Sequence, residues 1–204
     1  MDVKEIQQHF DNLFPAPKCE LNYKSEYELL VAVILSAQCT DKRVNVVTKE
    51  LFKRYNTPHK MLSLTQQQLE DKIHSCGFYH NKAKNILAMS RQLVEEYQGE
   101  VPSSTEELQK LAGVGRKTAN VVYAEAFGGQ AIAVDTHVLR VSNRLGFVKT
   151  KQPHECELAL MQKFDRASWG KLHLQMLLFG RYICKAKNPN CENCPFKTIC
   201  NKKR

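Results

Sequence analysis

The chain has 204 residues, 43% of them hydrophobic, and its 30 Lys and Arg exceed its 21 Asp and Glu, giving a formal net charge of +9. This length allows one large domain or two small ones with a stable core. The charge points to a polyanion or an anionic surface as partner, although a basic soluble protein without such a partner has the same charge. The longest apolar run, Leu29–Leu35, is too short to cross a bilayer, and no basic amphipathic segment with aromatic anchors stands out, so the sequence argues against membrane binding.

Helical apolar spacing recurs along the whole chain, separated by short polar connections. We find no alternating strand pattern of useful length and no internal repeat, so we predict an all-α fold. The expected helices cover residues 3–14, 25–37, 42–55, 65–77, 81–97, a short segment from 104, 118–127, 136–145, 153–164 and 169–184.

Two of the connections carry side chains of possible interest. Gln38 lies in the polar break between the second and third helices, where an amide would ordinarily cap the backbone. Phe78 follows Gly77, a typical glycine just past a helix end, where an aromatic ring would ordinarily close that end.

The run Leu111–Asn120 has the pattern of a helix, a tight hairpin and a second helix. Ser104 and Glu107 have capping-box spacing, so a short helix should start there, and Gly113 and Gly115 should end it because glycine adopts positive φ without steric cost. The first N–H groups of the second helix have no partner within the helix and carry the positive end of its dipole. Such an end suits an anion such as a DNA phosphate, although an ordinary connection between bundle helices has the same glycines.

Lys117 lies in the first turn of that second helix, beside Arg116. An amine next to a bound phosphate backbone is close to a sugar carbon, and a neutral lysine can form a Schiff base with an aldehydic carbon. The alternative is a lysine that contacts phosphate or solvent only.

Asp135 follows the apolar run Ala131–Val134 and precedes a further helix, so we predict that it is the N-cap residue. A capping carboxylate is held in a fixed direction, and it could face Lys117, stabilise positive charge at a sugar and move protons. In the helix that follows, Arg140 and Arg144 share one basic face, which is either solvated or in contact with phosphate.

The cysteines fall into two groups. Four are scattered along the chain and are interpreted as packing residues: Cys19, Cys39, Cys76 and Cys156. The other four lie within 17 residues of a polar C-terminal segment that needs a metal to order it: Cys184, Cys191, Cys194 and Cys200. Their spacing alone leaves zinc and an iron–sulfur cluster both open.

The run Leu111–Asn120, together with Val134–His137, resembles the helix-hairpin-helix DNA glycosylases, and within them endonuclease III. One departure is visible, because the hairpin usually begins Leu-Pro-Gly and here has Ala112 as its second residue. We expect a less rigid turn with unchanged function. The resemblance extends from about Leu21 to Cys200.

The resemblance implies residue roles as well as a fold. Lys117 would be the Schiff-base nucleophile and Asp135 the essential carboxylate. Gln38 would enter the DNA stack where the damaged base was, and Phe78 would wedge the opposite strand. The cysteine spacing is that of a [4Fe–4S] cluster in this family. The remaining candidate DNA contacts are Gly113, Gly115, Arg116, His137, Arg140, Lys185 and Lys187.

The implied architecture has two helical lobes flanking a DNA cleft. Residues 20–130 would form a helical barrel with the hairpin, and residues 1–19 and 131–204 a second lobe with the cluster loop at 184–200. Since the start of the chain lacks a signal-peptide pattern, we expect a cytoplasmic, nucleoid-associated bacterial protein that works as a monomer.

The implied activity is removal of oxidised pyrimidines from double-stranded DNA and cutting of the strand at abasic sites by β-elimination. Three alternatives remain at this stage. A monofunctional mismatch adenine glycosylase would usually lack the lysine, a pyrimidine-dimer glycosylase/lyase would keep Lys117 and Asp135, and a non-catalytic hairpin protein would need neither.

Overall fold

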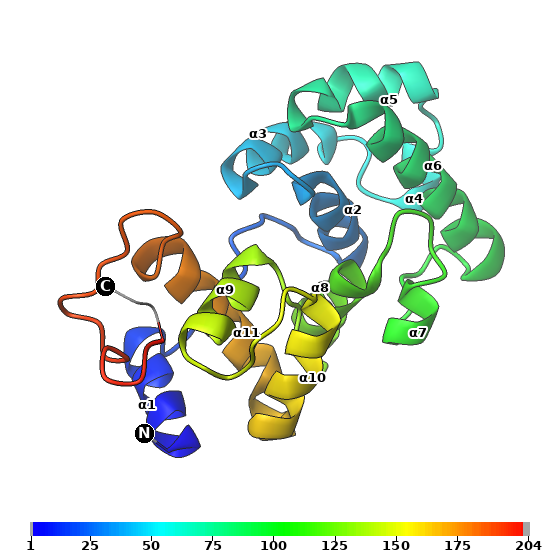
Figure 1. Ribbon diagram of the computed structural model, residues 1–204. Helices are drawn as coiled ribbons and strands as arrows, with labels where there is room; N and C mark the ends of the chain where they lie inside the picture. The colour runs from blue at the N-terminus through cyan, green and yellow to red at the C-terminus, as the bar shows by residue number, and fades with distance from the viewer. Residues whose placement is uncertain (1, 202–204) are drawn as a thin grey trace. The chain divides into compact units, whose positions relative to one another are not determined.

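The structure is a computed structural model that describes residues 2–201. Within that range the regular elements are all helical and no strand occurs, which confirms the predicted all-α fold. The chain divides into two compact units (Figure 1): residues Cys19–Phe127 form one, and the segments up to Lys18 and from Gly128 onward form the other. No helix in the described range is long and apolar enough to cross a membrane.

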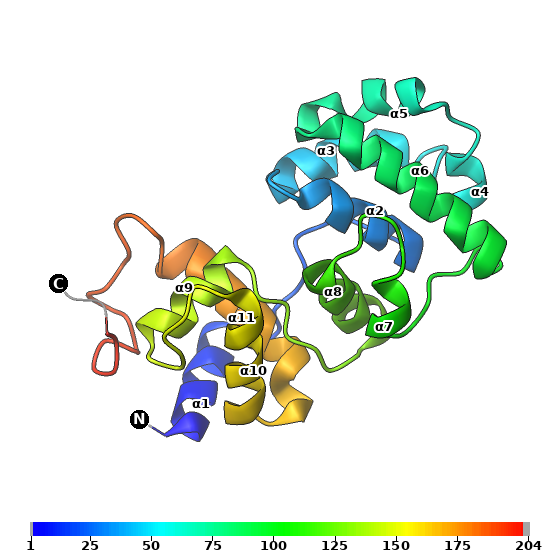
Figure 2. The same cartoon turned by 45° about the vertical axis from the view of Figure 1, so that its right-hand side comes forward.

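The unit of residues 19–127 is built around one buried helix, α2. Every residue from Tyr27 to Leu35 is buried, and α2 packs against three other helices of the unit, α3, α6 and α8. Figure 2 shows α5 and α6 running side by side in the same unit. The elements are α2 (Glu26–Ser36), α3 (Asp41–Leu51), α4 (Pro58–Met61), α5 (Gln66–Ile73), the 3-10 turn η1 (His74–Cys76), α6 (Tyr79–Glu96), α7 (Thr105–Leu108) and α8 (Arg116–Phe127).

The other unit joins the start and the end of the chain, because α1 packs against α11. Three buried aromatic rings, Phe10, Phe179 and Phe196, meet in its core, with the first and last only 4.7 Å apart between centroids. Its elements are α1 (Val3–Leu13), α9 (Thr136–Arg144), α10 (Pro153–Lys163), the 3-10 turn η2 (Arg166–Ser168), α11 (Trp169–Leu178) and the π-turn η3 (Phe179–Ile183).

The helix expected over residues 169–184 is confirmed as a continuous helical segment from Trp169 to Ile183, but its last five residues are π-helical. The α-helix ends at Leu178 and the chain continues as a π-turn, a change that apolar periodicity does not reveal. A Cβ atom on Gly180 would lie 2.9 Å from the Cβ of His137, so this glycine allows the π-turn to lie close against α9.

The predicted helix starts are largely confirmed. Thr65 and Gln68 form the complete capping box. At the short helix α7, Ser104 accepts a hydrogen bond from the Glu107 backbone at 3.2 Å, but the Glu107 carboxylate binds the Lys110 ammonium at 2.6 Å and does not complete the box. Only half of that predicted motif therefore forms.

The hairpin between α7 and α8 is supported by side chains of α6. Gly113 has φ +77°, and a Cβ atom there would lie 2.8 Å from the Cβ of Asn85. The Gln92 amide bridges the turn, because its Nε2 donates to the Lys110 carbonyl at 3.2 Å and its Oε1 accepts from the Ala112 backbone N–H at 2.7 Å. Asn85 and Gln92 thus fix the hairpin by contact and by hydrogen bonds.

Ala112 takes the place of the proline expected in this hairpin. Proline has no N–H and fixes its own φ, whereas alanine leaves φ free and supplies a donor. In this chain the donor is used by Gln92. The bridging amide therefore replaces part of the rigidity that a proline ring would give.

We expect Gln92→Leu and Ala112→Pro to be coupled in stability. Ala112→Pro deletes the backbone N–H that donates a hydrogen bond to Gln92. It should therefore lower the free energy of unfolding by about 1 kcal/mol more in the parent than in Gln92→Leu. The measurement is urea unfolding of the parent, both single variants and the double variant. Costs that add within about 0.3 kcal/mol would show that the bridge contributes nothing.

Candidate functional site

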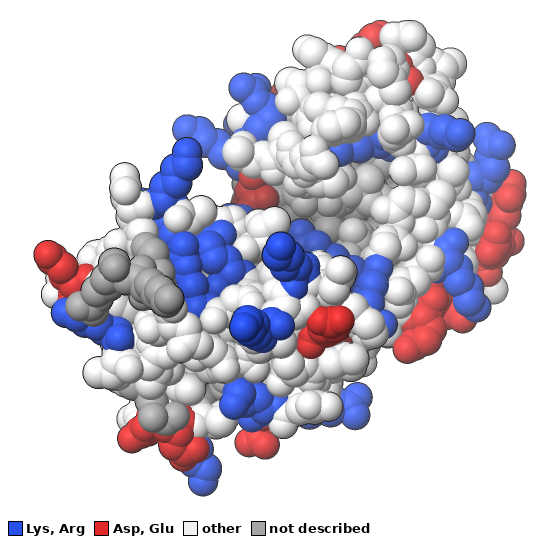
Figure 3. Space-filling model, in the orientation of Figure 1, with Lys and Arg blue, Asp and Glu red and all other residues white. Residues whose placement is uncertain are grey.

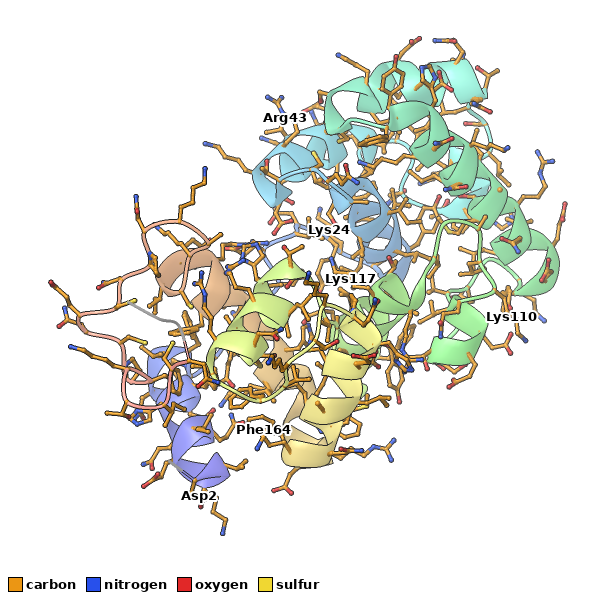
Figure 4. All side chains as sticks on the ribbon, in the orientation of Figure 1. Asp2, Lys24, Arg43, Lys110, Lys117 and Phe164 are labelled. Atoms are coloured by element: carbon orange, nitrogen blue, oxygen red, sulfur yellow. The ribbon has the colours of Figure 1, made fainter. Side chains whose placement is uncertain are left out.

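Lys117 lies where the sequence predicts, in the first turn of α8, which starts at Arg116 (Figure 4). The Ala119 N–H bonds the Gly115 carbonyl at 2.9 Å, so the helical hydrogen bonding begins directly at the turn. Both glycines of the turn are exposed, as are Arg116 and Lys117. A Cβ atom built on Gly115 meets nothing within 4 Å, so a ligand can approach this backbone closely.

Asp135 is the N-cap residue of α9, as predicted. Its Oδ1 accepts from the backbone N–H groups of His137 and Val138, each at 2.8 Å. Both bonds use one oxygen, so the cap fixes the carboxylate without engaging Oδ2. The buried residues 131–134 lead directly into this cap and hold it against the core.

Gln38 and Phe78 share an unusual backbone conformation. Gln38 has φ +53° and Phe78 has φ +48°, a region that residues with side chains rarely occupy. Both side chains are exposed, and Phe78 is 64% exposed, so its ring does not close the helix end as an apolar staple would. A strained backbone that presents an aromatic ring to solvent is typical of a functional position.

The two arginines of α9 do not form a simple solvated face. Arg140 donates from Nε to the Cys184 carbonyl at 3.1 Å and from Nη2 to the Gly180 carbonyl at 2.7 Å, and its Nη2 also lies 3.2 Å from Nδ1 of His137. Burial and the nearby Arg144 lower the pKa of Arg140. Arg140 is thus bound to the chain around Cys184, and a DNA contact by it stays a prediction.

Arg144 completes the attachment of that chain segment. Its guanidinium donates to the Lys185 carbonyl at 2.8 Å and lies 3.2 Å from Sγ of Cys184. On the face in Figure 3, blue side chains gather over α9 and the adjoining chain, whereas red ones gather near α7. Lys185 and Lys187 are exposed at the start of the cysteine segment.

The four C-terminal cysteines lie in a segment with no helix or strand among described residues 184–201. All four thiols are half-buried and none forms a disulfide. Burial raises the pKa of the Cys194 thiol, and the three other thiols raise it further, so each of them lies within electrostatic range of Cys194. Within the described residues, no three His, Cys, Asp or Glu side chains converge as a ready ligand set for one metal ion.

Two residues that serve this site have no sequence signal. Lys82 is buried on α6, and its ammonium binds the turns that carry Gln38 and Phe78. Gln92 bridges the hairpin before Lys117. A polar residue in an amphipathic helix is ordinarily assigned to the solvated face, and only the distant carbonyl partners reveal these roles.

Comparison with known proteins identifies the family of this chain. The family model described as HhH-GPD superfamily base excision DNA repair protein matches residues 31–166. Endonuclease III of Bacillus subtilis (strain 168) is 48% identical over 204 residues, which cover 98% of this chain and 93% of that protein. Endonuclease III of Escherichia coli (strain K12) is 43% identical over 189 residues, which cover 93% of this chain and 90% of that protein.

Solved structures give the same result. A trapped endonuclease III–DNA covalent intermediate has a TM-score of 0.94 and 47% sequence identity, covering 98% of this chain and 96% of that chain. A thermostable thymine-DNA glycosylase, 24% identical, shares the fold with a TM-score of 0.83. The resemblance seen in the hairpin is thereby confirmed: the chain belongs to the HhH-GPD superfamily of base excision DNA repair proteins and, within it, to the endonuclease III family of DNA glycosylases with AP lyase activity.

Proposed function

We propose that this chain removes oxidised pyrimidines from double-stranded DNA and cuts the strand 3′ to the resulting abasic site, with Lys117 as the nucleophile. The observation that carries the proposal is the exposed amine of Lys117 in the first turn of α8, directly after the open backbone of Gly115. A phosphate bound by the N–H groups of this turn would bring the neighbouring deoxyribose to the amine. Arg116, also exposed, adds positive charge beside the same phosphate.

The proposed reaction has two steps at one sugar. The neutral Lys117 amine attacks C1′, the N-glycosidic bond breaks and the base leaves with its electron pair, forming a Schiff base after ring opening. The Schiff base acidifies the C2′ hydrogen, a base removes that proton, and the C3′–O bond breaks by β-elimination. The expelled base takes up a proton, and water finally hydrolyses the Schiff base, which frees the Lys117 amine and leaves an unsaturated aldehyde on one end of the cut strand.

Asp135 would assist both steps through its carboxylate. Its Oδ1 is held by two backbone N–H groups, so Oδ2 is the oxygen available to stabilise positive charge on the sugar and to carry protons. Lys117 and Asp135 belong to different units of the chain, and their convergence on one deoxyribose is part of the proposal.

The remaining candidate residues would hold and open the duplex. Flipping a base costs a few kcal/mol, least for a damaged base, and leaves a gap in the stack. Gln38 and Phe78 would fill that gap and wedge the opposite strand, which their exposure supports. Lys185 and Lys187 would contact phosphates, and His137 lies at the start of α9 beside Asp135.

We further propose that Cys184, Cys191, Cys194 and Cys200 hold a [4Fe–4S] cluster, which would order this segment when bound. The donor chemistry fits, because four half-buried thiols lie in one short segment and thiolates are the ligands that iron–sulfur clusters use. Arg144, beside Sγ of Cys184, would donate to a thiolate there. The cluster would keep Lys185 and Lys187 in place for DNA. We also propose that the protein acts as a monomer on the bacterial chromosome.

Borohydride reduction on DNA with an abasic site tests the nucleophile. We expect a covalent protein–DNA adduct with the parent chain and none with Lys117→Ala, because reduction fixes only a Schiff base. Lys84→Ala, which removes an exposed amine on α6, is the matched control and should trap like the parent. An undiminished adduct with Lys117→Ala would reject the assignment, and nicking of single-lesion duplexes would separate oxidised pyrimidines from pyrimidine dimers.

Metal analysis tests the cysteine site. The purified chain should be yellow-brown with about four iron atoms per chain, and Cys194→Ser should lose most of this iron. Cys19→Ser changes a half-buried cysteine outside the segment and should keep the full iron content. A colourless protein with one zinc ion per chain would contradict the cluster and leave the Lys117 proposal standing.

A further inference from the structure

Lys82 has its ammonium group buried inside the unit of residues 19–127. The side chain is only 5% exposed. Its Nζ donates to the carbonyls of Leu35 and Ala37, each at 2.8 Å, and to the carbonyl of Cys76 at 2.7 Å. An ammonium has three N–H donors, so these three carbonyls use all of them.

The three carbonyls belong to two separate turns. Leu35 and Ala37 lie at the end of α2, directly before Gln38, and Cys76 lies two residues before Phe78. The two turns are about 40 positions apart in the sequence, and no backbone hydrogen bond joins them within described residues 2–201. The Lys82 ammonium links the backbones of the two turns, and a hydrogen bond between the Cys39 and Cys76 thiols joins them through side chains. The helices that carry these turns, α2, α3 and α6, lie together in Figure 1.

This arrangement is costly unless the turns need it. Burial lowers the pKa of Lys82, while the neighbouring Cys76 and Cys39 thiols act in the opposite direction. The three hydrogen bonds of this ammonium all go to backbone carbonyls, so carbonyl dipoles stabilise its charge. Each turn leads into a residue with positive φ and an exposed side chain. The buried ammonium therefore stabilises the backbone beside the two strained positions.

We infer that Lys82 is a positioning residue that joins the two turns into one rigid unit, so that Gln38 and Phe78 enter the DNA together. The inference rests on the proposed function, in which both side chains enter the duplex. If the turns are rigidly joined, the two side chains enter the same opening of the duplex together. Removing either side chain then also removes most of the DNA affinity that the other contributes. If they move separately, each side chain contributes on its own.

A double-variant cycle measures this coupling. The ligand is a duplex with a tetrahydrofuran abasic analogue, which binds without reacting, and the readout is the dissociation constant. Gln38→Ala, Phe78→Ala and their combination are compared in the parent chain and in Lys82→Met. In the parent we expect each single change and the combination to weaken binding by a similar factor of about ten. In the Lys82→Met background, the combined variant should weaken binding by the product of the two single-variant factors.

The control separates positioning from general stability. Ser90 is buried on α6 about two turns beyond Lys82, and its hydroxyl bonds the Tyr27 hydroxyl at 2.7 Å. Ser90→Ala should lower the melting temperature, yet the combined loss should stay close to either single loss. Lys82→Gln, which keeps two donors, should give partial multiplication and serves if Lys82→Met does not fold.

Two results would overturn the inference and are distinguishable. In the first result, the losses of DNA affinity from Gln38→Ala and Phe78→Ala combine in the same way in the parent and in Lys82→Met. Both side chains then enter DNA but the ammonium does not join them, and the proposed function survives. Binding that is unchanged by Gln38→Ala and Phe78→Ala removes their role in the duplex and takes the inference with it. Trapping through Lys117 remains a separate measurement in either case.

Discussion

Two polar side chains of α6 form hydrogen bonds with backbone groups in the turns that carry the candidate site residues. Lys82 binds carbonyls of the turns before Gln38 and Phe78, and Gln92 binds one carbonyl and one N–H of the hairpin before Lys117. A turn that presents side chains or amides to a ligand has few internal hydrogen bonds, so a neighbouring helix must supply partners. The proposed recognition of DNA therefore depends on a helix that need not touch DNA.

Much of the fold and site could be predicted because the signals are local. Thr65 and Gln68 fix a helix start within four residues, and Asp135 is recognisable as an N-cap from the change between an extended run and a helix. The hairpin glycines and Lys117 lie within one continuous motif. In each case the physical cause is contained in a few adjacent residues, which one sequence is enough to show.

What could not be predicted depends on contacts between distant segments. Nothing local distinguishes Lys82 from a solvated lysine, because its partners are the carbonyls of another turn. The π-turn after Leu178 has the same apolar spacing as an α-helix and shows itself only where Gly180 lies against α9. Arg140 has the spacing of a basic surface, yet its guanidinium binds carbonyls of the chain around Cys184.

The alanine in the hairpin has a consequence for observing this protein in solution. Because position 112 keeps an amide proton, bonded to Gln92, the exchange rate of that proton with solvent reports how often the hairpin opens. A relative with proline there has no such proton and gives no signal at this place. In this chain, nuclear magnetic resonance could therefore observe the hairpin proposed to bind phosphate through an atom of its own backbone.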